Sequence, residues 1–172
     1  MDRHPLSGRV RAGFAARAHA YERHAVLQRA IAWRLAHGCR DLPLPAGPAA
    51  DLGAGTGLLA QTLSEQAQAG RRCGWLDARG LLQLDLCPQL LARNPGARRW
   101  GGRQWDLEQG LPAELSGAAL LCSSFALQWL SQPGPRLENW CEWLAPGGWL
   151  VLAVPTAASF PQWHRAAARA GV

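Results

Sequence analysis

A glycine-rich segment, Asp51-Leu52-Gly53-Ala54-Gly55-Thr56-Gly57, has the residue types and spacing of a loop that binds a small ligand through its backbone. Glycine has no Cβ, so backbone N–H groups at the start of a following helix can approach a bound molecule. The spacing is G-x-G-x-G after an aspartate, whereas the dinucleotide fingerprint is G-x-G-x-x-G. This spacing favours S-adenosylmethionine (SAM) over NAD. The competing interpretation is a tight strand-to-helix turn without a ligand.

A carboxylate at the end of the next strand is the residue type that holds ribose hydroxyls in doubly wound folds. Asp85 fits this role, because it follows the apolar run 81–84 and precedes a helix that opens with Pro88. Asp77 is the alternative, since it lies nearer the usual distance of ~20 residues from the glycine turn. Arg79-Gly80 after Asp77 is more typical of a turn. We therefore prefer Asp85, with Leu86 beside it.

Further polar residues follow the later predicted strands. Asp106, with Leu107 next to it, is placed to accept a hydrogen bond from an adenine amino group; the alternative is a helix N-cap. Ser123 and Ser124 end another apolar run, where they could line the site of group transfer. Core packing is the favoured interpretation for the tryptophans of this half of the chain, because large aromatic residues dominate cores: Trp129, Trp140, Trp143 and Trp149.

No group of residues has the pattern of a catalytic triad or a metal site. His19, Tyr21 and His24 have imperfect helical spacing for a shared site, so a solvated helix face is the better interpretation. The five cysteines lack the paired spacing of a zinc site or a disulfide framework, and we expect them to be reduced core residues: Cys39, Cys73, Cys87, Cys122 and Cys141.

The elements that must position these residues alternate between strands and helices after a proline-rich loop at 42–48. We expect strands ending near Asp51 and covering 80–85, 103–105, 118–123 and 148–154, the last after a turn at 145–147. Helices are expected at 58–67, 88–92 and 159–172. This alternation predicts an α/β fold with a Rossmann-like, doubly wound and mostly parallel sheet.

The N-terminal part shows helical spacing of apolar residues over 12–37, and Gly38 is expected to stop the helix. We therefore divide the chain into an N-terminal helical cap segment, 1–45, and a cofactor-binding core, 46–172, within one domain overall.

Composition limits the remaining possibilities. The 172 residues are 48% hydrophobic and 17% charged, which is typical of one globular domain. No apolar run approaches the ~20 residues that span a bilayer, and the first residues lack the pattern of a secretory signal. We therefore expect a cytoplasmic protein. All 18 basic residues are arginine against 12 acidic residues, which favours an acidic partner; the arginines are too dispersed to predict nucleic-acid binding.

Taken together, the motifs resemble the malonyl-[acyl-carrier protein] O-methyltransferases of biotin synthesis, a family of class I SAM-dependent methyltransferases. The resemblance covers nearly the whole chain. Its more specific parts are 14–21, 127–129 and 159–164, whereas the glycine motif and the turn at 145–148 are general to the superfamily. The matching residues are Phe14 to Tyr21, Leu27-Gln28, Asp51 to Gly57, Asp85 with Pro88 to Leu91, Asp106 to Pro112, Ser123 to Trp129 and Leu144 to Gly148.

The resemblance implies that SAM is the cofactor, held by Gly53, Gly55, Gly57, Asp85 and Asp106, and that Tyr21 closes over the site. Gln128 and Trp129 would contact the substrate. A malonyl group on acyl carrier protein would then be methylated on its free carboxylate, which is already ionised near neutral pH and needs no general base. This agrees with the lack of a catalytic constellation, and an acidic carrier protein suits the net charge of +6.

Two departures from the family pattern keep alternatives open. The stretch between Gly57 and Asp85 is longer than expected, and the chain stops where family members continue with further strands, so we expect a C-terminally truncated form. The alternatives are a methyltransferase of another small molecule and a catalytically silent module that binds SAM or a carrier protein. A Rossmann oxidoreductase is disfavoured by the glycine spacing.

Overall fold

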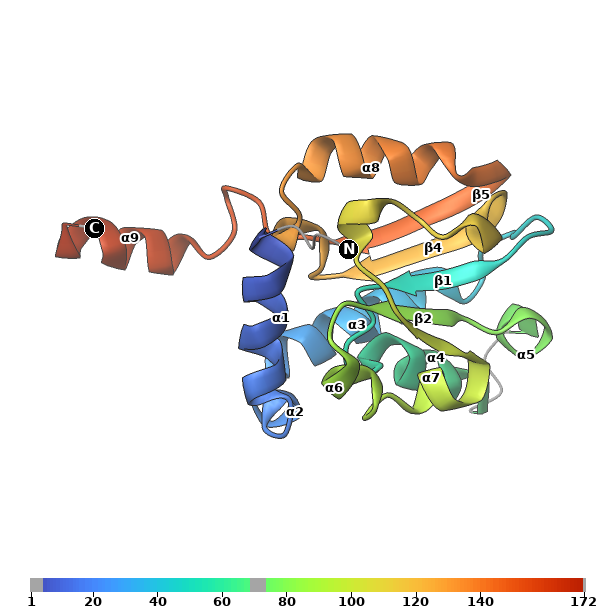
Figure 1. The fold of residues 1–172 in the computed structure, drawn as a ribbon, viewed down its shortest axis with the longest axis horizontal. Coiled ribbons are helices and arrows are strands. Elements are labelled where there is room, and N and C mark those ends of the chain that lie inside the picture. The colour runs from blue at the N-terminus through green and yellow to red at the C-terminus, as the bar shows by residue number, and fades with distance from the viewer. Residues whose placement is uncertain (1–4, 69–73, 172) are drawn as a thin grey trace.

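The computed structural model describes residues 5–68 and 74–171, and its described part forms one parallel sheet with helices on both faces (Figure 1). The strands are β1 (Ala49–Leu52), β2 (Leu82–Asp85), β3 (Gly102–Gln104), β4 (Ala118–Ser124) and β5 (Leu144–Ala153). Their order is β3-β2-β1-β4-β5, and every neighbouring pair is parallel. The predicted doubly wound α/β fold is confirmed.

The helices include nine α-helices and three short 3-10 helices in the described residues. The α-helices are α1 (Pro5–Arg17), α2 (Tyr21–His24), α3 (Val26–Cys39), α4 (Leu58–Gln68), α5 (Gly74–Arg79), α6 (Pro88–Leu91), α7 (Pro95–Trp100), α8 (Pro133–Glu142) and α9 (Pro161–Ala170). The 3-10 helices are η1 (Leu107–Gln109), η2 (Ala113–Leu115) and η3 (Leu127–Trp129). Proline occupies the first turn of α6, α7, α8 and α9, where its missing N–H costs no hydrogen bond.

Alternate residues of the central strands enter two separate cores. Ala49 and Leu120 belong to a core beneath α3, α4 and α5, whereas Ala50 and Leu121 belong to a core beneath α8. Trp140 of α8 is fully buried in this second core, as predicted. Strands buried on both faces explain why β1 and β4 are almost continuous apolar runs.

The strand order reverses between β2 and β4, which lie on opposite sides of β1. In open parallel sheets, this switch point leaves a crevice at the carboxyl ends of the strands. The glycine segment follows β1, Asp85 ends β2 and Ser124 ends β4, so all three lie at this edge. The fold therefore brings the predicted site residues together.

The N-terminal segment differs from the prediction of one helix over 12–37. The structure has three helices, and α3 continues through Gly38 to Cys39. The segment breaks around 18–20 and again at Ala25, where α1 packs against α6 and α3 turns back to pack against α4. α3 contributes Ala32, Ala36 and Cys39 to the first core, whereas α1 packs against α6 at the sheet edge.

The structure also differs from the prediction in the long stretch between Gly57 and Asp85 and at the β5 end of the sheet. The long stretch before Asp85 contains α5, and Asp77 lies within this helix. β5 begins at Leu144, because the expected turn at 145–147 is a register shift within the strand, between the pairs formed by Ala118 and Leu120. α9 extends away from the sheet and buries none of its side chains (Figure 1).

Candidate functional site

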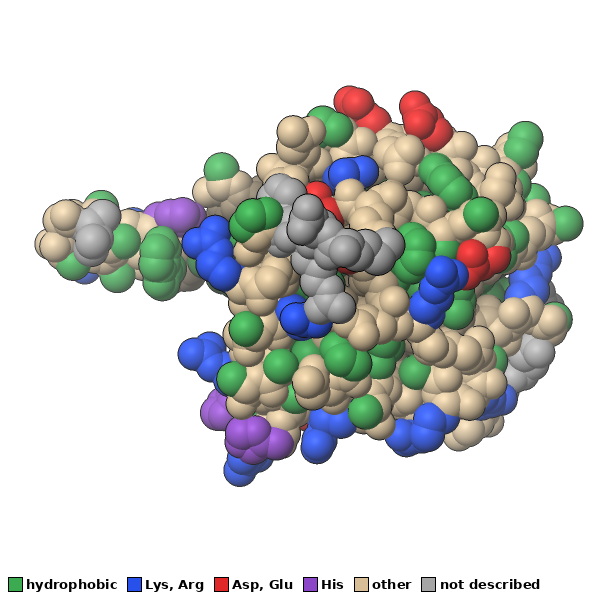
Figure 2. Space-filling model, in the orientation of Figure 1, with side chains coloured by type: hydrophobic (Ala, Val, Ile, Leu, Met, Phe, Trp, Pro, Cys, Tyr) green, Lys and Arg blue, Asp and Glu red, His purple; other side chains and the backbone are tan. Residues whose placement is uncertain are grey.

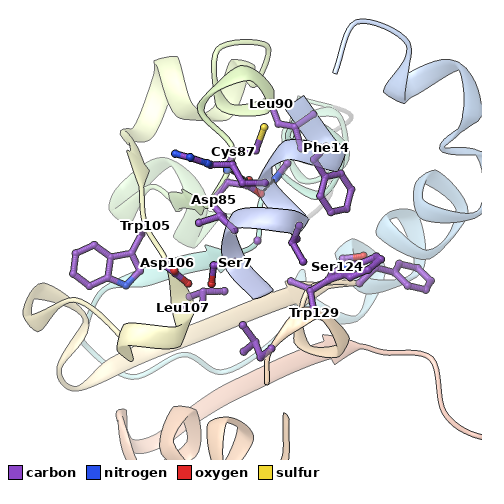
Figure 3. Close-up of a pocket in the computed structure, with 18 of the residues that line it drawn as sticks. Ser7, Phe14, Asp85, Cys87, Leu90, Trp105, Asp106, Leu107, Ser124 and Trp129 are labelled. Atoms are coloured by element: carbon purple, nitrogen blue, oxygen red, sulfur yellow. Dashed lines mark hydrogen bonds between the residues drawn. The ribbon is translucent and has the colours of Figure 1, made fainter. Parts of the chain in front are cut away.

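A cleft lies at the carboxyl ends of β1, β2 and β4 and is covered by α1 (Figure 3). Of the predicted site residues, eight line it: Tyr21, Gly53, Gly55, Asp85, Leu86, Asp106, Leu107 and Trp129. Asp51, Gly57, Ser123 and Gln128 do not, and each has another place in the structure.

The glycine turn is tied to the end of β2 by its own backbone. The N–H groups of Gly53 and Ala54 both donate to the carbonyl oxygen of Leu84, at 2.8 Å each. Gly55 has φ +55°, and a Cβ built on it meets no heavy atom within 4 Å, although Gly55 lines the cleft. The turn therefore presents open space at Gly55, where a ligand can approach the backbone.

Gly57 has a different role from Gly55. Its φ is +85°, and an added Cβ would overlap the side-chain amide of Asn94. Asn94 is fully buried, and its Nδ2 donates to the carbonyl oxygen of Gly55 at 3.3 Å and to Oε1 of Gln83 at 3.0 Å. Its Oδ1 accepts a hydrogen bond from the N–H of Ala97, which caps α7. Asn94 thus supports the turn from behind.

The Asp85 carboxylate is held at the floor of the cleft by two backbone donors. The N–H of Gly55 donates to Oδ2 and the N–H of Cys87 donates to Oδ1, each at 2.7 Å. Burial raises the pKa of Asp85, and these two hydrogen bonds oppose the rise. Asp85 ends β2, whereas Asp77, the other candidate, lies in α5 before that strand.

Asp51 lies next to the cleft and not in it. Its side chain is buried and lines a smaller adjoining cavity together with Gly53, Gly55, Tyr21 and Ser124. Burial, and next the negative charge of Asp85, raise its pKa to about 7. Asp51 can therefore change charge near neutral pH, directly beneath the glycine turn.

The far wall of the cleft follows β3. Trp105, Asp106 and Leu107 line it (Figure 3), and Leu86 lines it from the end of β2. Oδ1 of Asp106 accepts a hydrogen bond from the N–H of Glu108 at 3.0 Å and caps η1. The N-cap role considered for Asp106 is therefore present, and its carboxylate also faces the cleft. Leu86 and Leu107, with the Asp106 carboxylate nearby, are suited to contact a flat ring that carries a polar group at its edge.

The residues at the end of β4 and just after it divide between structural support and the cleft. Ser123 is buried, and its Oγ donates to the carbonyl oxygen of Leu52 at 2.9 Å, which joins β4 to β1. Ser124 lines the cleft instead. Gln128 does not line the cleft, since its Nε2 donates to the carbonyl oxygen of Phe125 at 2.9 Å. Phe125, with φ +57°, does line it.

Trp129 is part of an aromatic group on the opposite side of the cleft from Trp105. It is 46% exposed, so the core interpretation was wrong for this residue, as it was for Trp149 at 41%. Phe14 of α1 packs edge-on against Trp129, with ring centroids 5.6 Å apart, and against Tyr21 at 6.2 Å. Burial, and then the charge of Asp85, raise the pKa of Tyr21, so its phenol stays protonated at neutral pH.

Sequence reasoning missed several residues of the cleft. Ser7, Val10 and Arg11 come from the part of α1 before residue 12. Leu90 comes from α6, and Phe125 directly follows β4. A helical stripe at 7, 10, 14 and 18 was available as a signal, because these positions follow each other at three- and four-residue intervals. Arg11 is the one arginine among the described lining residues.

Among the described residues, no cluster of three or more His, Cys, Asp or Glu side chains could hold a metal ion. Cys39, Cys87 and Cys122 are buried free thiols as predicted, but Cys141 is exposed, and Cys73 lies outside the described residues. No helix in the described ranges has the length and apolar character needed to span a bilayer.

Comparisons with known proteins agree with this geometry. No family model matches the chain. It is 36% identical over 155 residues to the biotin biosynthesis bifunctional protein BioCD of Bordetella avium, covering 89% of this chain and 31% of the relative. It is 34% identical over 145 residues to a malonyl-[acyl-carrier protein] O-methyltransferase of Methylococcus capsulatus, covering 84% and 50%.

The chain thus spans half or less of the length of these two relatives. Among solved structures, a complex described as DhpI-SAM-HEP superposes with a TM-score of 0.65 at 18% identity, over 96% of this chain and 73% of the other. That likeness supports the fold alone. The sequence relatives thus agree with the resemblance to the malonyl-[acyl-carrier protein] O-methyltransferases, and the solved structure shares the fold of this chain.

Proposed function

We propose that this protein binds SAM in the cleft and transfers its methyl group to the free carboxylate of a malonyl group carried by acyl carrier protein, in biotin biosynthesis. One observation carries the proposal. The glycine turn after β1 is hydrogen-bonded through Gly55 to Asp85 at the end of β2, and the Cβ direction of Gly55 opens into the cleft. The names of the sequence relatives supply the acceptor.

The lining residues fit the parts of SAM. Asp85 would accept hydrogen bonds from the ribose hydroxyls, and Leu86 and Leu107 would hold the adenine ring between them, with Asp106 near its amino group. The amino-acid end would lie over the backbone of Gly53 and Gly55. Asp51, beneath that turn, provides negative charge for an ammonium group.

When bound, SAM supplies a sulfonium methyl group that a nucleophile can attack. A malonyl carboxylate is ionised near neutral pH, so it would accept the methyl group without a general base, with S-adenosylhomocysteine as the leaving group. The protein contributes position and exclusion of water. α1 covers the cleft for this purpose, and the protonated Tyr21 phenol can donate a hydrogen bond to the acceptor.

The acceptor would occupy the side of the cleft that carries the aromatic group. Trp129, Tyr21 and Phe14 form an apolar wall there, and Ser124 lies at the end of β4. Gln128 would act by fixing the turn that carries Trp129, since its amide holds the carbonyl of Phe125. Ser123 would act in the same indirect way through Leu52.

The predicted division of the chain remains part of the proposal. Residues 1–45 would form a cap segment and 46–172 the cofactor core of one domain, with α3 anchoring the cap to the core. We also propose that the protein works in the cytoplasm, where its acceptor would be made. Fractionation of cells that express the tagged protein would test this placement.

Methyl transfer is tested with SAM labelled in the methyl group. Malonyl-acyl carrier protein is the acceptor, and acetyl-acyl carrier protein is the matched control because it lacks the free carboxylate. Label transferred to the malonyl form alone, in a base-labile ester, supports the proposal. SAM binding without transfer to the malonyl carrier would contradict it and identify a binding module.

A further inference from the structure

The outer surface of the two helices that cover the cleft is basic. Residues 5–24 include Arg9, Arg11, Arg17 and Arg23 but a single acidic residue, Glu22, which gives a formal charge of +3. α8, in contrast, exposes Glu138 and Glu142. Figure 2 shows basic and histidine side chains along α1 and α2, and acidic side chains over α8. The charge of the molecule is therefore unevenly distributed around the cleft.

Three of these four arginines lie outside the cleft, whereas Arg11 lines it. Positions 7, 10, 14 and 18 of the helical stripe are buried or half-buried toward the cleft and α6, whereas Arg9 and Arg17 are exposed. Arg9 and Arg17 are eight residues apart, which corresponds to about 12 Å along the helix. Arg23 of α2, which follows Arg17 in the sequence, is also exposed. None of these three arginines forms an ion pair with another described residue.

The arginines of α1 and α2 differ in position from the other arginines of the chain, because they lie beside the cleft. α7 also carries exposed arginines, such as Arg98, but it packs on the far side of β2 and β3 and contributes no residue to the cleft. α1 and α2 both contribute to the cleft. A partner that delivers a tethered acyl group must bind beside the opening into which the group enters.

We propose that Arg9, Arg17 and Arg23 form a docking surface for an acidic acyl carrier protein, whose acyl-bearing arm then enters the cleft beside α1. This proposal rests on the proposed function, because it takes the carrier-bound malonyl group as the substrate. Unpaired guanidinium groups can form charge-assisted hydrogen bonds with carboxylates of the carrier. Complementary charge raises the association rate and makes binding sensitive to salt.

Charge reversal tests the surface without touching the cleft. In the Arg9→Glu/Arg17→Glu variant, we expect KM for malonyl-acyl carrier protein to rise about tenfold or more at low salt, with kcat unchanged. The variant should methylate malonyl-pantetheine, which has the acyl arm but no carrier protein, as well as the original chain does. Arg23→Glu should show the same pattern more weakly. Arg98→Glu is the matched control and should leave KM unchanged.

The two proposals fail in different ways. Equal loss of activity toward malonyl-pantetheine, or the same rise in KM with Arg98→Glu, overturns the docking surface but not methyl transfer. If the chain methylates no malonyl thioester, the proposed function fails, and direct binding of malonyl-acyl carrier protein still tests the surface. Binding that the double reversal abolishes and Arg98→Glu retains supports it, whereas no binding overturns it. Retained titration with S-adenosylhomocysteine and an unchanged circular dichroism spectrum confirm that the variants fold.

Discussion

The backbone N–H of Gly55 donates a hydrogen bond of 2.7 Å to Oδ2 of Asp85, thirty residues later in the chain. This bond joins the loop after β1 to the end of β2. The carboxylate is oriented by the same turn that leaves space for the ligand, and its other oxygen is held by Cys87. The cleft is therefore organised before a ligand enters.

Asp85→Asn should weaken binding of S-adenosylhomocysteine by roughly tenfold to a hundredfold, because a hydrogen bond to a charged group contributes about 1.5–3 kcal/mol. Asn keeps the size of the side chain but loses the charge and one acceptor. Calorimetric titration measures the change. Asp77→Asn is the control, and a larger loss of affinity in that variant would contradict the assignment of Asp85.

Gly57→Ala should destabilise the protein by roughly 2–5 kcal/mol, since the new methyl group is strained at φ +85° and overlaps Asn94. Gly55→Ala meets no neighbour, so it should cost only roughly 1–2 kcal/mol from its backbone conformation. Urea unfolding of both variants provides the comparison. Equal losses of stability would mean that Asn94 does not support the turn as the structure shows.

Asp51 should make stability depend on pH. Its pKa is about 7 in the folded protein against 3.8 as the ordinary value, so the folded state holds its proton more tightly than the unfolded state. The contribution is fully present below pH 3.8 and is lost as pH rises through 7, up to about 4 kcal/mol in total.

The comparison of pH 5 with pH 8 isolates this effect. The original chain should lose more unfolding free energy between these values than Asp51→Asn, whose side chain does not titrate. Asp85 contributes in the same direction in both proteins, because burial raises its pKa too. Identical pH dependence in the two proteins would show that the pKa of Asp51 is not raised in the folded protein.

The Phe14–Trp129 contact should hold α1 over the cleft. A perpendicular ring pair is worth about 0.5–1.5 kcal/mol beyond the area that it buries. A double-mutant cycle with Phe14→Leu and Trp129→Leu, measured on S-adenosylhomocysteine affinity, should give a coupling energy in this range. Strictly additive losses would indicate that closure of α1 does not depend on this pair.

The strand ends could be predicted from sequence because several local signals agree there. Buried apolar runs ended at residues 52, 85 and 124, and glycine or proline followed the first two. The choice of Asp85 over Asp77 came from Pro88, which marks the start of α6. Asp106 was found in the same way, at the end of a short run beside a turn.

The missed features depend on contacts between distant segments. Asn94 looks like an ordinary helix cap in the sequence, and only the fold places its amide behind Gly55. Trp129 was expected in the core because of its type, yet a 3-10 turn after β4 places it at the cleft. The break of the N-terminal segment into α1 and α2 follows from the packing of α1 on α6, which no local pattern encodes.

The measurement that tests the account most directly is calorimetric titration of the purified chain with SAM and, in parallel, with NAD. Gly55→Asp serves as the control, because aspartate tolerates φ +55° and its side chain would enter the open space at that position. The account predicts saturable SAM binding that Gly55→Asp abolishes, and no NAD binding. Folded protein that binds NAD, or that binds SAM equally well in the Gly55→Asp variant, would contradict it.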